Sequence, residues 1–342
     1  MAEEFSWSSS ITRLLEGQSL SDDETAAAMS EIMEGAATPA QIAGFVVALR
    51  SKGETTDEIV GLVRAMRSFA LKVEAGDDVV DTCGTGGDRA GTFNVSTAAA
   101  IVCAGAGARV AKHGNRAASS KCGSADVLEE LGVKLDLQPA AVATCIDEAG
   151  MGFCFAPIFH PAMRHAGVTR RELGIPTIFN FLGPLTNPAG AKRQALGVSD
   201  PRMVDKMVET LRRLGSQRVV AFHGDSGLDE LSLSGPSRVV ELIDGETKTS
   251  EVDPTHLGFE RAPLDAVKGG TAEENAAAIR AVLAGERGPR RDIVVLNTAA
   301  GLVAAGLAAD MSEGVQLASQ AIDSGSASDA LDKLIEVSNS QA

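Results

Sequence analysis

Residues 81–100, with the sequence DTCGTGGDRAGTFNVSTAAA, place glycines, hydroxyl side chains and acids between two apolar segments. Gly84, Gly86 and Gly87 can adopt positive φ angles and can bring backbone N–H groups close to a ligand. The Ala-rich segment from about Ser96 predicts a helix, and the N-terminus of a helix attracts an anion. The stretch therefore predicts a phosphate-binding turn between a strand and a helix.

The glycine-rich turn matches neither of two common phosphate-binding motifs. It contains neither G-x-x-x-x-G-K-[ST] nor G-x-G-x-x-G. Taken alone, it is equally typical of an ordinary tight turn between a strand and a helix. Asn94, Ser96 and Thr97 favour ligand binding, because they put polar side chains at the start of the predicted helix.

A second polar loop, KHGNRAASSKCGSAD at residues 112–126, follows the predicted strand ARVAKHG. Ligands of open parallel sheets bind beyond the carboxyl ends of the strands. We therefore expect this loop to meet residues 84–88 at one edge of the sheet. Its converging side chains would be Lys112, Asn115, Arg116, Ser119 and Lys121. The alternative is a solvated basic loop.

A third loop, HGDSGLDELSL, presents Asp225, Asp229 and Glu230 directly after a predicted strand. Mg²⁺ prefers oxygen ligands and is commonly held by one or two carboxylates together with water and substrate phosphates. The adjacent Asp229 and Glu230 are therefore candidate metal ligands. The alternative is a solvated acidic turn.

Composition limits the class of protein. The chain has 342 residues, of which 44% are hydrophobic, and a formal net charge of −15. This predicts a globular protein of two structural parts that does not bind nucleic acid. The N-terminus MAEEFSWSSS is acidic, and the apolar runs are too short to span a membrane. The five cysteines are odd in number and contain no C-x-x-C pair, so we expect a cytoplasmic protein that does not contact membranes.

The order of predicted elements indicates an α/β protein with an additional helical part. Capping boxes predict short helices in the first seventy residues, at Ser21/Glu24, Thr38/Gln41 and Thr55/Glu58. Strands then alternate with helices, which favours a mostly parallel sheet covered on both faces.

The alternation is interrupted by GVTRRELGIPTIFNFLGPLTNP at about residues 166–190, which we expect to return to the helical part. The expected domains are therefore a small helical domain at residues 1–72, with about 166–190, and a larger α/β domain at 73–165 and 191–342.

Five segments in order, GTGGD, FNVST, KHGNRAASSKCGSAD, FAPIFHPAMRHAGVTRRELGIPTIFNFLGPLTNP and GDSGLDELS, resemble the anthranilate phosphoribosyltransferase family of tryptophan biosynthesis. The resemblance runs from the N-terminal helices to the C-terminus. It implies the helical-plus-α/β fold shared by class II nucleoside phosphorylases and class III phosphoribosyltransferases. It also implies a homodimeric pentosyltransferase that uses Mg²⁺, about two ions per monomer.

The implied reaction moves the 5-phosphoribosyl group of phosphoribosyl pyrophosphate (PRPP) to the amine of anthranilate. The products would be N-(5-phosphoribosyl)anthranilate and pyrophosphate, in the second step of tryptophan synthesis from chorismate. The resemblance implies no covalent nucleophile.

The resemblance also implies three sets of site residues. Those around PRPP would be Gly84, Thr85, Gly86, Gly87, Asp88, Thr92, Asn94, Val95, Ser96, Thr97, Lys112, Asn115, Arg116, Ala117, Ala118, Ser119, Ser120 and Ser124. Those around anthranilate would be Gly84, Asn115, Pro157, His160, Met163 and Arg170, with Arg170 pairing with the substrate carboxylate. The metal would be held by Ser96, Asp229 and Glu230.

Two other functions fit parts of the same sequence. A class II nucleoside phosphorylase would share the architecture and the glycine-rich turn, but KHGNRAASS and the pair Asp229 and Glu230 argue against it. A non-catalytic paralogue that binds nucleic acid is opposed by the acidic balance of the chain. For His160, a packing role remains an alternative to substrate contact.

Overall fold

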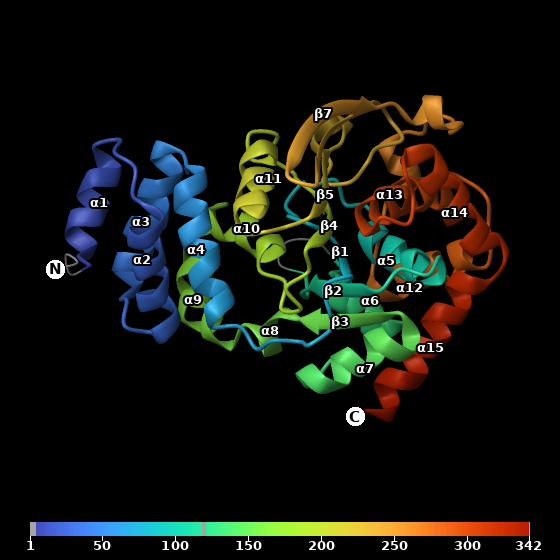
Figure 1. The fold of residues 1–342 in the computed structure, drawn as a ribbon, viewed down its shortest axis with the longest axis horizontal. Helices are drawn as coiled ribbons and strands as arrows, with labels where there is room; N and C mark the ends of the chain where they lie inside the picture. The colour runs from blue at the N-terminus through green and yellow to red at the C-terminus, as the bar shows by residue number, and fades with distance from the viewer. Residues whose placement is uncertain (1–4, 118–120, 342) are drawn as a thin grey trace.

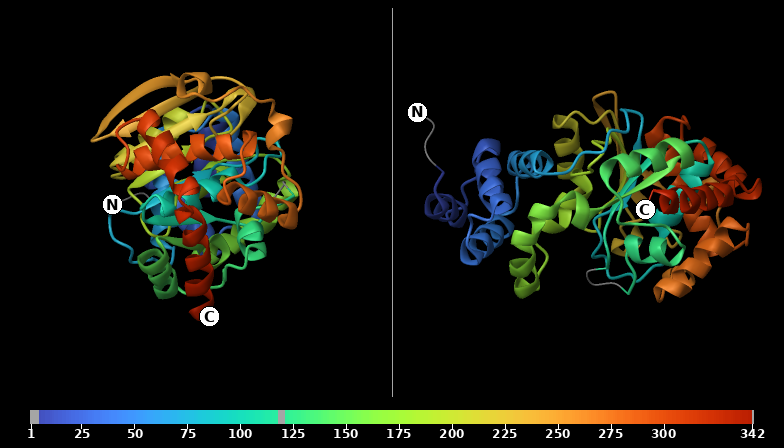
Figure 2. Two further views of the ribbon diagram at one scale, coloured as in Figure 1. Left: turned by 90° about the vertical axis from the view of Figure 1, so that its right-hand side faces the viewer. Right: turned by 90° about the horizontal axis from the view of Figure 1, so that it is seen from below.

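The computed structural model describes residues 5–117 and 121–341 and shows an elongated molecule. Helices from the N-terminal part form one end, and a sheet wrapped by helices forms the rest (Figure 1). The C-terminal helices lie at the end opposite the N-terminal helices, as two further views show (Figure 2). The predicted combination of a helical part and a larger α/β part is confirmed.

The N-terminal part consists of four helices, α1 (Trp7–Leu15), α2 (Asp22–Glu34), α3 (Pro39–Lys52) and α4 (Thr56–Ser68). All three predicted capping boxes are formed: the side chains of Ser21, Thr38 and Thr55 accept hydrogen bonds from the backbone three residues on. Each box satisfies N–H groups that the first turn of a helix leaves without partners. These short local signals therefore fix where α2, α3 and α4 begin.

The larger part is built on a seven-stranded sheet in the order β3-β2-β1-β4-β5-β6-β7. The first five strands are parallel: β1 (Val80–Gly84), β2 (Val110–Gly114), β3 (Met151–Phe155), β4 (Arg193–Gly197) and β5 (Arg218–His223). The predicted mostly parallel sheet is confirmed. Two antiparallel strands, β6 (Ser237–Ile243) and β7 (Glu246–Val252), extend it. This hairpin was not predicted from the sequence, because β7 is largely exposed and polar and carries no apolar alternation.

The two faces of the sheet pack into different hydrophobic cores. On β4 and β5, Ala195 and Val220 belong to one core, whereas Leu196 and Val219 belong to the other. Alternate strand residues point to opposite faces, so this division follows from the pleat. The first core includes α5 (Val95–Gly105) and α13 (Pro289–Ala305), and the second includes the N-terminal helices and α11 (Val204–Arg213).

The remaining helices surround the sheet and the connections between its strands. Helices α6 (Ser124–Glu130), α7 (Pro139–Ala149) and α12 (Ala272–Leu283) lie with α14 (Met311–Asp323) and α15 (Ser326–Ser340) on the side of the first core (Figure 1). Helices α14 and α15, at the C-terminal end of the described chain, both pack against α5.

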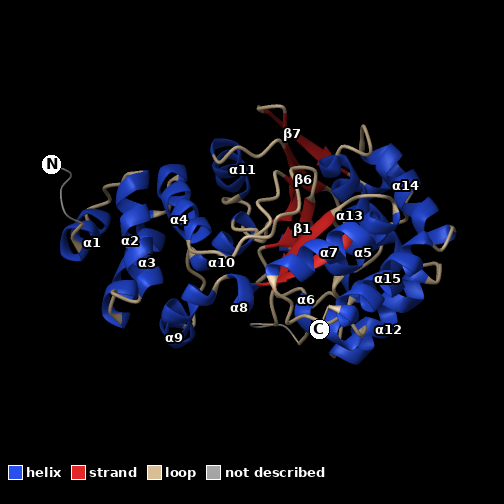
Figure 3. Cartoon of the chain, turned by 60° about the horizontal axis from the view of Figure 1, so that its bottom comes forward, coloured by secondary structure: helices blue, strands red, loops and turns tan. Residues whose placement is uncertain are grey.

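Three helices follow β3 and lead back toward the N-terminal part: α8 (Ala156–Phe159), α9 (Arg164–Leu173) and α10 (Phe179–Leu182). Helix α9 contacts α2 and α3, and Figure 3 shows it beside them and away from the sheet. Ile178 and Phe179 are buried in the same core as the N-terminal helices. The domain boundaries expected at about residues 72, 165 and 190 stay a prediction.

None of the described helices is long and apolar enough to cross a membrane. The five cysteines all lie in described parts of the chain, are buried and form no disulfide.

Candidate active site

The candidate site lies at the carboxyl ends of β1, β4 and β5, where three glycines let the loop after β5 pack directly on the strands. A Cβ atom at Gly84 would overlap the carboxylate of Asp229, and one at Gly197 would overlap the Asp229 carbonyl oxygen. A Cβ atom at Gly224 would overlap the carbonyl oxygen of Glu230. Only glycine permits so close an approach of two backbones, so these positions fix where Asp229 and Glu230 stand.

The glycine-rich turn combines two different uses of glycine. Gly86 and Gly87 have φ angles of 68° and 80°, as the sequence predicted, and a Cβ at either would meet nothing within 4 Å. Gly84 differs from the expectation: it has no positive φ and ends β1, where it is needed for its closeness to Asp229. The N–H of Gly86 donates to Asp229 Oδ2 at 2.7 Å, which ties the turn to the acidic loop.

Asp88 and Asp229 bring two carboxyl groups together at this turn. Asp88 Oδ1 accepts from Ala90 N at 3.0 Å, whereas its buried Oδ2 has no hydrogen-bond partner among the described residues. Burial, and next the neighbouring Asp88 carboxylate, raise the pKa of Asp229 to about 7. A cation between such groups would relieve both effects, so the Asp229 position fits Mg²⁺. Within the described ranges, no three His, Cys, Asp or Glu side chains gather as a metal cluster.

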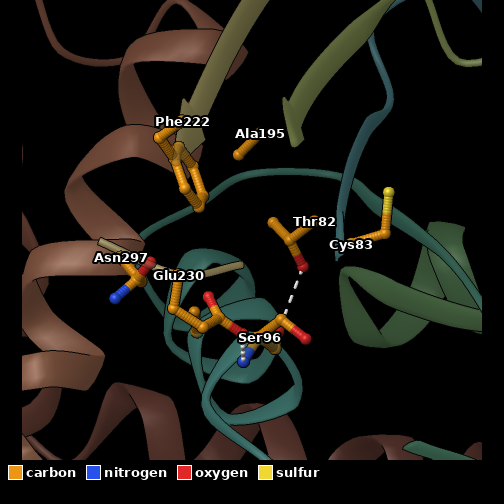
Figure 4. A pocket seen from close by; sticks show the side chains of 8 residues that line it. Thr82, Cys83, Ser96, Ala195, Phe222, Glu230 and Asn297 are labelled. Carbon is orange, nitrogen blue, oxygen red and sulfur yellow. Dashed lines mark hydrogen bonds between the residues drawn. The ribbon is translucent and has the colours of Figure 1, made fainter. Parts of the chain in front are cut away.

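Glu230 lies on the inner side of the turn, against the start of α5. Its Oε1 accepts from Ser96 N at 3.1 Å, and the Thr82 hydroxyl donates to Ser96 O at 3.2 Å (Figure 4). Lys112 is buried, and its Nζ donates to Thr82 O and to Ser96 Oγ, the latter at 3.4 Å. Burial, followed by Asp229, raises the pKa of Glu230 above its ordinary value. The structure thus brings Ser96 and Lys112 together with Glu230, which follows both by more than a hundred residues of sequence.

Three polar residues that the sequence analysis did not select support the same loops. Ser199 N donates to Thr85 Oγ1 at 3.0 Å, and Ser199 Oγ donates to Gly86 O at 2.9 Å. The side chain of Asn297, on α13, holds the backbone of Leu231: Leu231 N donates to Asn297 Oδ1 at 2.8 Å, and Asn297 Nδ2 donates to Leu231 O at 3.0 Å. Asn275 donates to Asn94 Oδ1 at 2.8 Å. Ser199 follows a strand end and could have been found on that ground, but the two asparagines lie inside helices and carry no local signal.

The other candidates at the start of α5 occupy three settings. Thr92 forms an isolated bridge with Lys268, and Val95 is the buried first residue of α5. Thr97 is buried, and its hydroxyl has no hydrogen-bond partner among the described residues. The Thr97 hydroxyl is therefore enclosed by the protein rather than exposed to a ligand.

The loop after β2 is only partly gathered at the site. Arg116 pairs with Asp126 and Glu129 of α6 at 2.9 and 2.8 Å rather than facing the glycine turn. Ser124 Oγ donates to the Asn115 carbonyl at 3.2 Å, and Ala117 N donates to Asp126 Oδ2 at 3.0 Å. Three further candidates of this loop, Ala118, Ser119 and Ser120, lie outside the described residues, and Lys121 is exposed.

The candidates for the aromatic substrate follow β2 and β3, which pair as neighbours up to Gly114 and Phe155. Asn115 and Pro157 therefore follow adjacent strand ends. The His160 ring lies 5.1 Å from that of His113, centroid to centroid, and is 7% exposed. Burial lowers the pKa of His160 to about 4, so its ring is neutral at pH 7. His113 was not selected from the sequence, although it lies within the polar segment at residues 112–126.

Two further candidates sit on the helical side of this group. Met163 packs against the core that holds the N-terminal helices. Arg170, on α9, is partly buried and lies over the Phe179 ring at 5.3 Å, whereas its neighbour Arg171 is exposed. Burial lowers the pKa of the Arg170 guanidinium.

The fold and the site define a glycosyl transferase. The α/β domain model of the glycosyl transferase family matches residues 76–328, and the helical bundle domain model of the same family matches residues 8–70. The chain is 54% identical over 331 residues to an anthranilate phosphoribosyltransferase of Roseiflexus castenholzii, covering 96% of this chain and 97% of the relative.

Solved structures agree. The anthranilate phosphoribosyltransferase of Thermus thermophilus superimposes with a TM-score of 0.91 at 46% identity, covering 96% of this chain and 99% of that one. The enzyme of Saccharomyces cerevisiae, in complex with PRPP and Mg, gives a TM-score of 0.89 at 29% identity and covers 98% of both chains. The chain belongs to the anthranilate phosphoribosyltransferase family.

Proposed function

We propose that this protein transfers the 5-phosphoribosyl group of PRPP to the amine of anthranilate, with pyrophosphate as the leaving group. One observation carries the proposal: the acidic pair is fastened to the glycine-rich turn and to the start of α5, through Asp229 with Gly86 and Glu230 with Ser96. This arrangement sets carboxylates beside a cradle of N–H groups, which is what a magnesium diphosphate needs. The S. cerevisiae relative, solved with PRPP and Mg, supports the same assignment.

In this proposal the phosphate side of the site does most of the electrostatic work. The N–H groups of the glycine turn and the start of α5 that Asp229 and Glu230 leave free would bind the phosphate oxygens. Asp229 and Glu230, with Ser96, would hold about two Mg²⁺ ions, which supply positive charge against the leaving diphosphate. Lys112 donates hydrogen bonds to Thr82 O and Ser96 Oγ and so orients the start of α5. Transfer then needs positioning and charge stabilisation rather than a nucleophilic side chain.

The aromatic side would orient anthranilate. The guanidinium of Arg170 matches a carboxylate in bidentate geometry. His160 is neutral at pH 7, so it can donate or accept a hydrogen bond without adding charge beside the ring. The amine of anthranilate is weakly basic and already neutral, so a strong general base is unnecessary. Asn115 and Pro157 would line the same space because they follow adjacent strand ends.

We further propose a cytoplasmic homodimer. The helical part supports dimerisation because Leu15, Val47 and Val168 are 71%, 40% and 49% exposed on α1, α3 and α9. These helices contact one another in the order α1, α3, α9, and exposed apolar side chains on adjoining helices favour association. Light scattering on the purified chain should give a mass near twice 35.2 kDa.

The activity can be tested directly. The protein is mixed with PRPP, Mg²⁺ and anthranilate, and the loss of anthranilate fluorescence is followed, with omission of each component as a control. A parallel reaction supplies a nucleoside and inorganic phosphate in place of both substrates. Fluorescence loss that requires all three components is expected; phosphorolysis of the nucleoside without that loss would refute the proposal.

A further inference from the structure

A pocket rich in arginine lies away from the glycine turn, between α12 and the start of α13. Its volume is about 230 Å³. It is lined by Ala266, Ala278, Ala281, Val282, Glu286, Arg287, Gly288, Pro289, Arg290 and Arg291. None of these residues belongs to the candidate active site, so the pocket requires its own explanation.

The start of α13 exposes N–H groups to this pocket. Helix α13 spans 17 residues, and its N-cap is Gly288, which as a glycine has no side chain to cap the first turn. Pro289 follows at the first helical position. Uncapped N–H groups at the positive end of a long helix attract an anion.

The arginines at this helix start carry positive charge, which the partial positive charge of a helix N-terminus disfavours. Arg290 and Arg291 occupy the first turn of α13, where acidic rather than basic side chains are stabilising. Arg291 is only 2% exposed, and its Nη1 has no hydrogen-bond partner among the described residues. Arg291 Nη2 pairs with Asp323, but leaving the buried Nη1 donor without a partner is costly, which points to a missing anion.

Arg290 and Arg287 each make a polar contact within the protein that leaves other guanidinium donors over. Arg290 Nη2 donates to Lys268 O at 3.1 Å, and its guanidinium lies 5.9 Å from the centroid of the Phe93 ring. Arg287 is held only loosely, at 3.4 Å from Asp323. Asp323 also pairs with Arg291 at 2.8 Å, so one carboxylate is shared by two arginines. Glu286 is the acidic side chain among the lining residues.

We propose that this pocket binds a compact phosphate-like oxyanion, held by Arg287, Arg290 and Arg291 together with the first N–H groups of α13. Two or three guanidinium groups with a helix N-terminus suit a divalent oxyanion, because each N–H donor can meet a separate oxygen. Asp292, in the first turn of α13, interacts with Arg291 and Arg287, and together with Asp323 and Glu286 it offsets the arginine charges, so recognition rests on the directed N–H donors. The pocket is therefore selective for a small anion rather than an electrostatic surface for a polyanion.

The test is calorimetric titration of inorganic phosphate into the full-length protein at low ionic strength. The wild type should show two classes of phosphate site, one at the glycine turn and one at this pocket. The double variant Arg287→Gln with Arg290→Gln should lose only the second class, with at least about tenfold weaker binding, because a hydrogen bond to a charged group is removed at each position. Both arginines are exposed, so the variant should fold.

Three comparisons make the outcome decisive. Arg280→Gln removes an exposed arginine of α12 that bonds Leu131 O outside the pocket, and should leave both classes unchanged. Asp323→Asn frees Arg287 and Arg291 and should tighten the second class severalfold. Gly87→Val should lose the first class and keep the second.

Retention of both classes by the double arginine variant would overturn the proposal. So would acetate binding at the second class as tightly as phosphate, since the pocket would then hold any anion. Because the two pockets share no residue, this result does not depend on whether the protein transfers phosphoribosyl groups.

Discussion

The phosphate side and the aromatic side of the candidate site are built in different ways. On the phosphate side, the turn after β1, the start of α5 and the loop after β5 are bonded to one another, as Gly86 with Asp229 and Ser96 with Glu230 show. On the aromatic side, Arg170 belongs to α9, which packs with the N-terminal helices in the other core. The first region is preorganised by the sheet, whereas the geometry of the second depends on how the helical part sits against it.

The comparison is sharpest at the acidic loop. Replacing both carboxylates, Asp229→Ala with Glu230→Ala, should lower kcat by at least about 10²–10³-fold, because the leaving diphosphate would lose its metal anchor. Turnover is measured at limiting Mg²⁺. Asp225→Ala, in an exposed position of the same loop, serves as the matched control and should stay near wild type. Near-normal turnover of the double variant would remove the metal assignment.

On the aromatic side, Arg170→Ala should reduce kcat/KM for anthranilate by about 10- to 150-fold, mainly through KM, because one hydrogen bond to a charged group is lost. PRPP binding should be unchanged, since Arg170 lies on α9. Steady-state kinetics with each substrate varied in turn gives both values. The exposed neighbour, Arg171→Ala, is the control. Loss of PRPP affinity in both variants would show that the two sides are not separate.

The glycine turn tests preorganisation itself. Gly87→Val forces a β-branched side chain into a φ of 80°, at a backbone cost of about 1–3 kcal/mol, and should weaken PRPP by about 5- to 150-fold in calorimetry. The cost comes from conformation, because a Cβ at this position meets nothing within 4 Å. Gly167→Val on α9 has equal space without a positive φ, so it should leave PRPP affinity intact. Unchanged PRPP binding by a folded Gly87→Val protein would return this stretch to an ordinary turn.

The smallest expected effect is on how the free energy of unfolding depends on pH, through the two histidines of the aromatic side. Burial lowers the pKa of His113 to about 3 and that of His160 to about 4. The unfolded chain, with a histidine pKa of about 6.5, takes up protons that the folded chain refuses, so the free energy of unfolding should fall as pH drops from about 6.5 toward 4.

His160→Gln should reduce that slope by about 1.2 kcal/mol per pH unit, measured by urea unfolding between pH 6 and pH 5. The exposed His256→Gln is the control and should keep the wild-type slope. An unchanged slope in His160→Gln would mean that this ring is protonated in the folded protein.

Local signals in the sequence determined much of the fold. The capping boxes begin with Ser21, Thr38 and Thr55, and each fixes a helix start through contacts within three residues. The positive φ angles of Gly86 and Gly87 were likewise readable, because only local backbone sterics are involved. The resemblance of five motifs, in their order along the chain, to the anthranilate phosphoribosyltransferase family led to the function proposed here.

Only the tertiary structure decided the contacts between distant segments. The need for glycine at Gly84 comes from Asp229, which is 145 residues away in sequence, and the ion pairs of Arg116 with α6 divert a side chain expected at the turn. Asn297 reaches the acidic loop from inside a helix. Such positions are set by which strand ends and helix faces the packed cores bring together, and no local pattern of residue types records that.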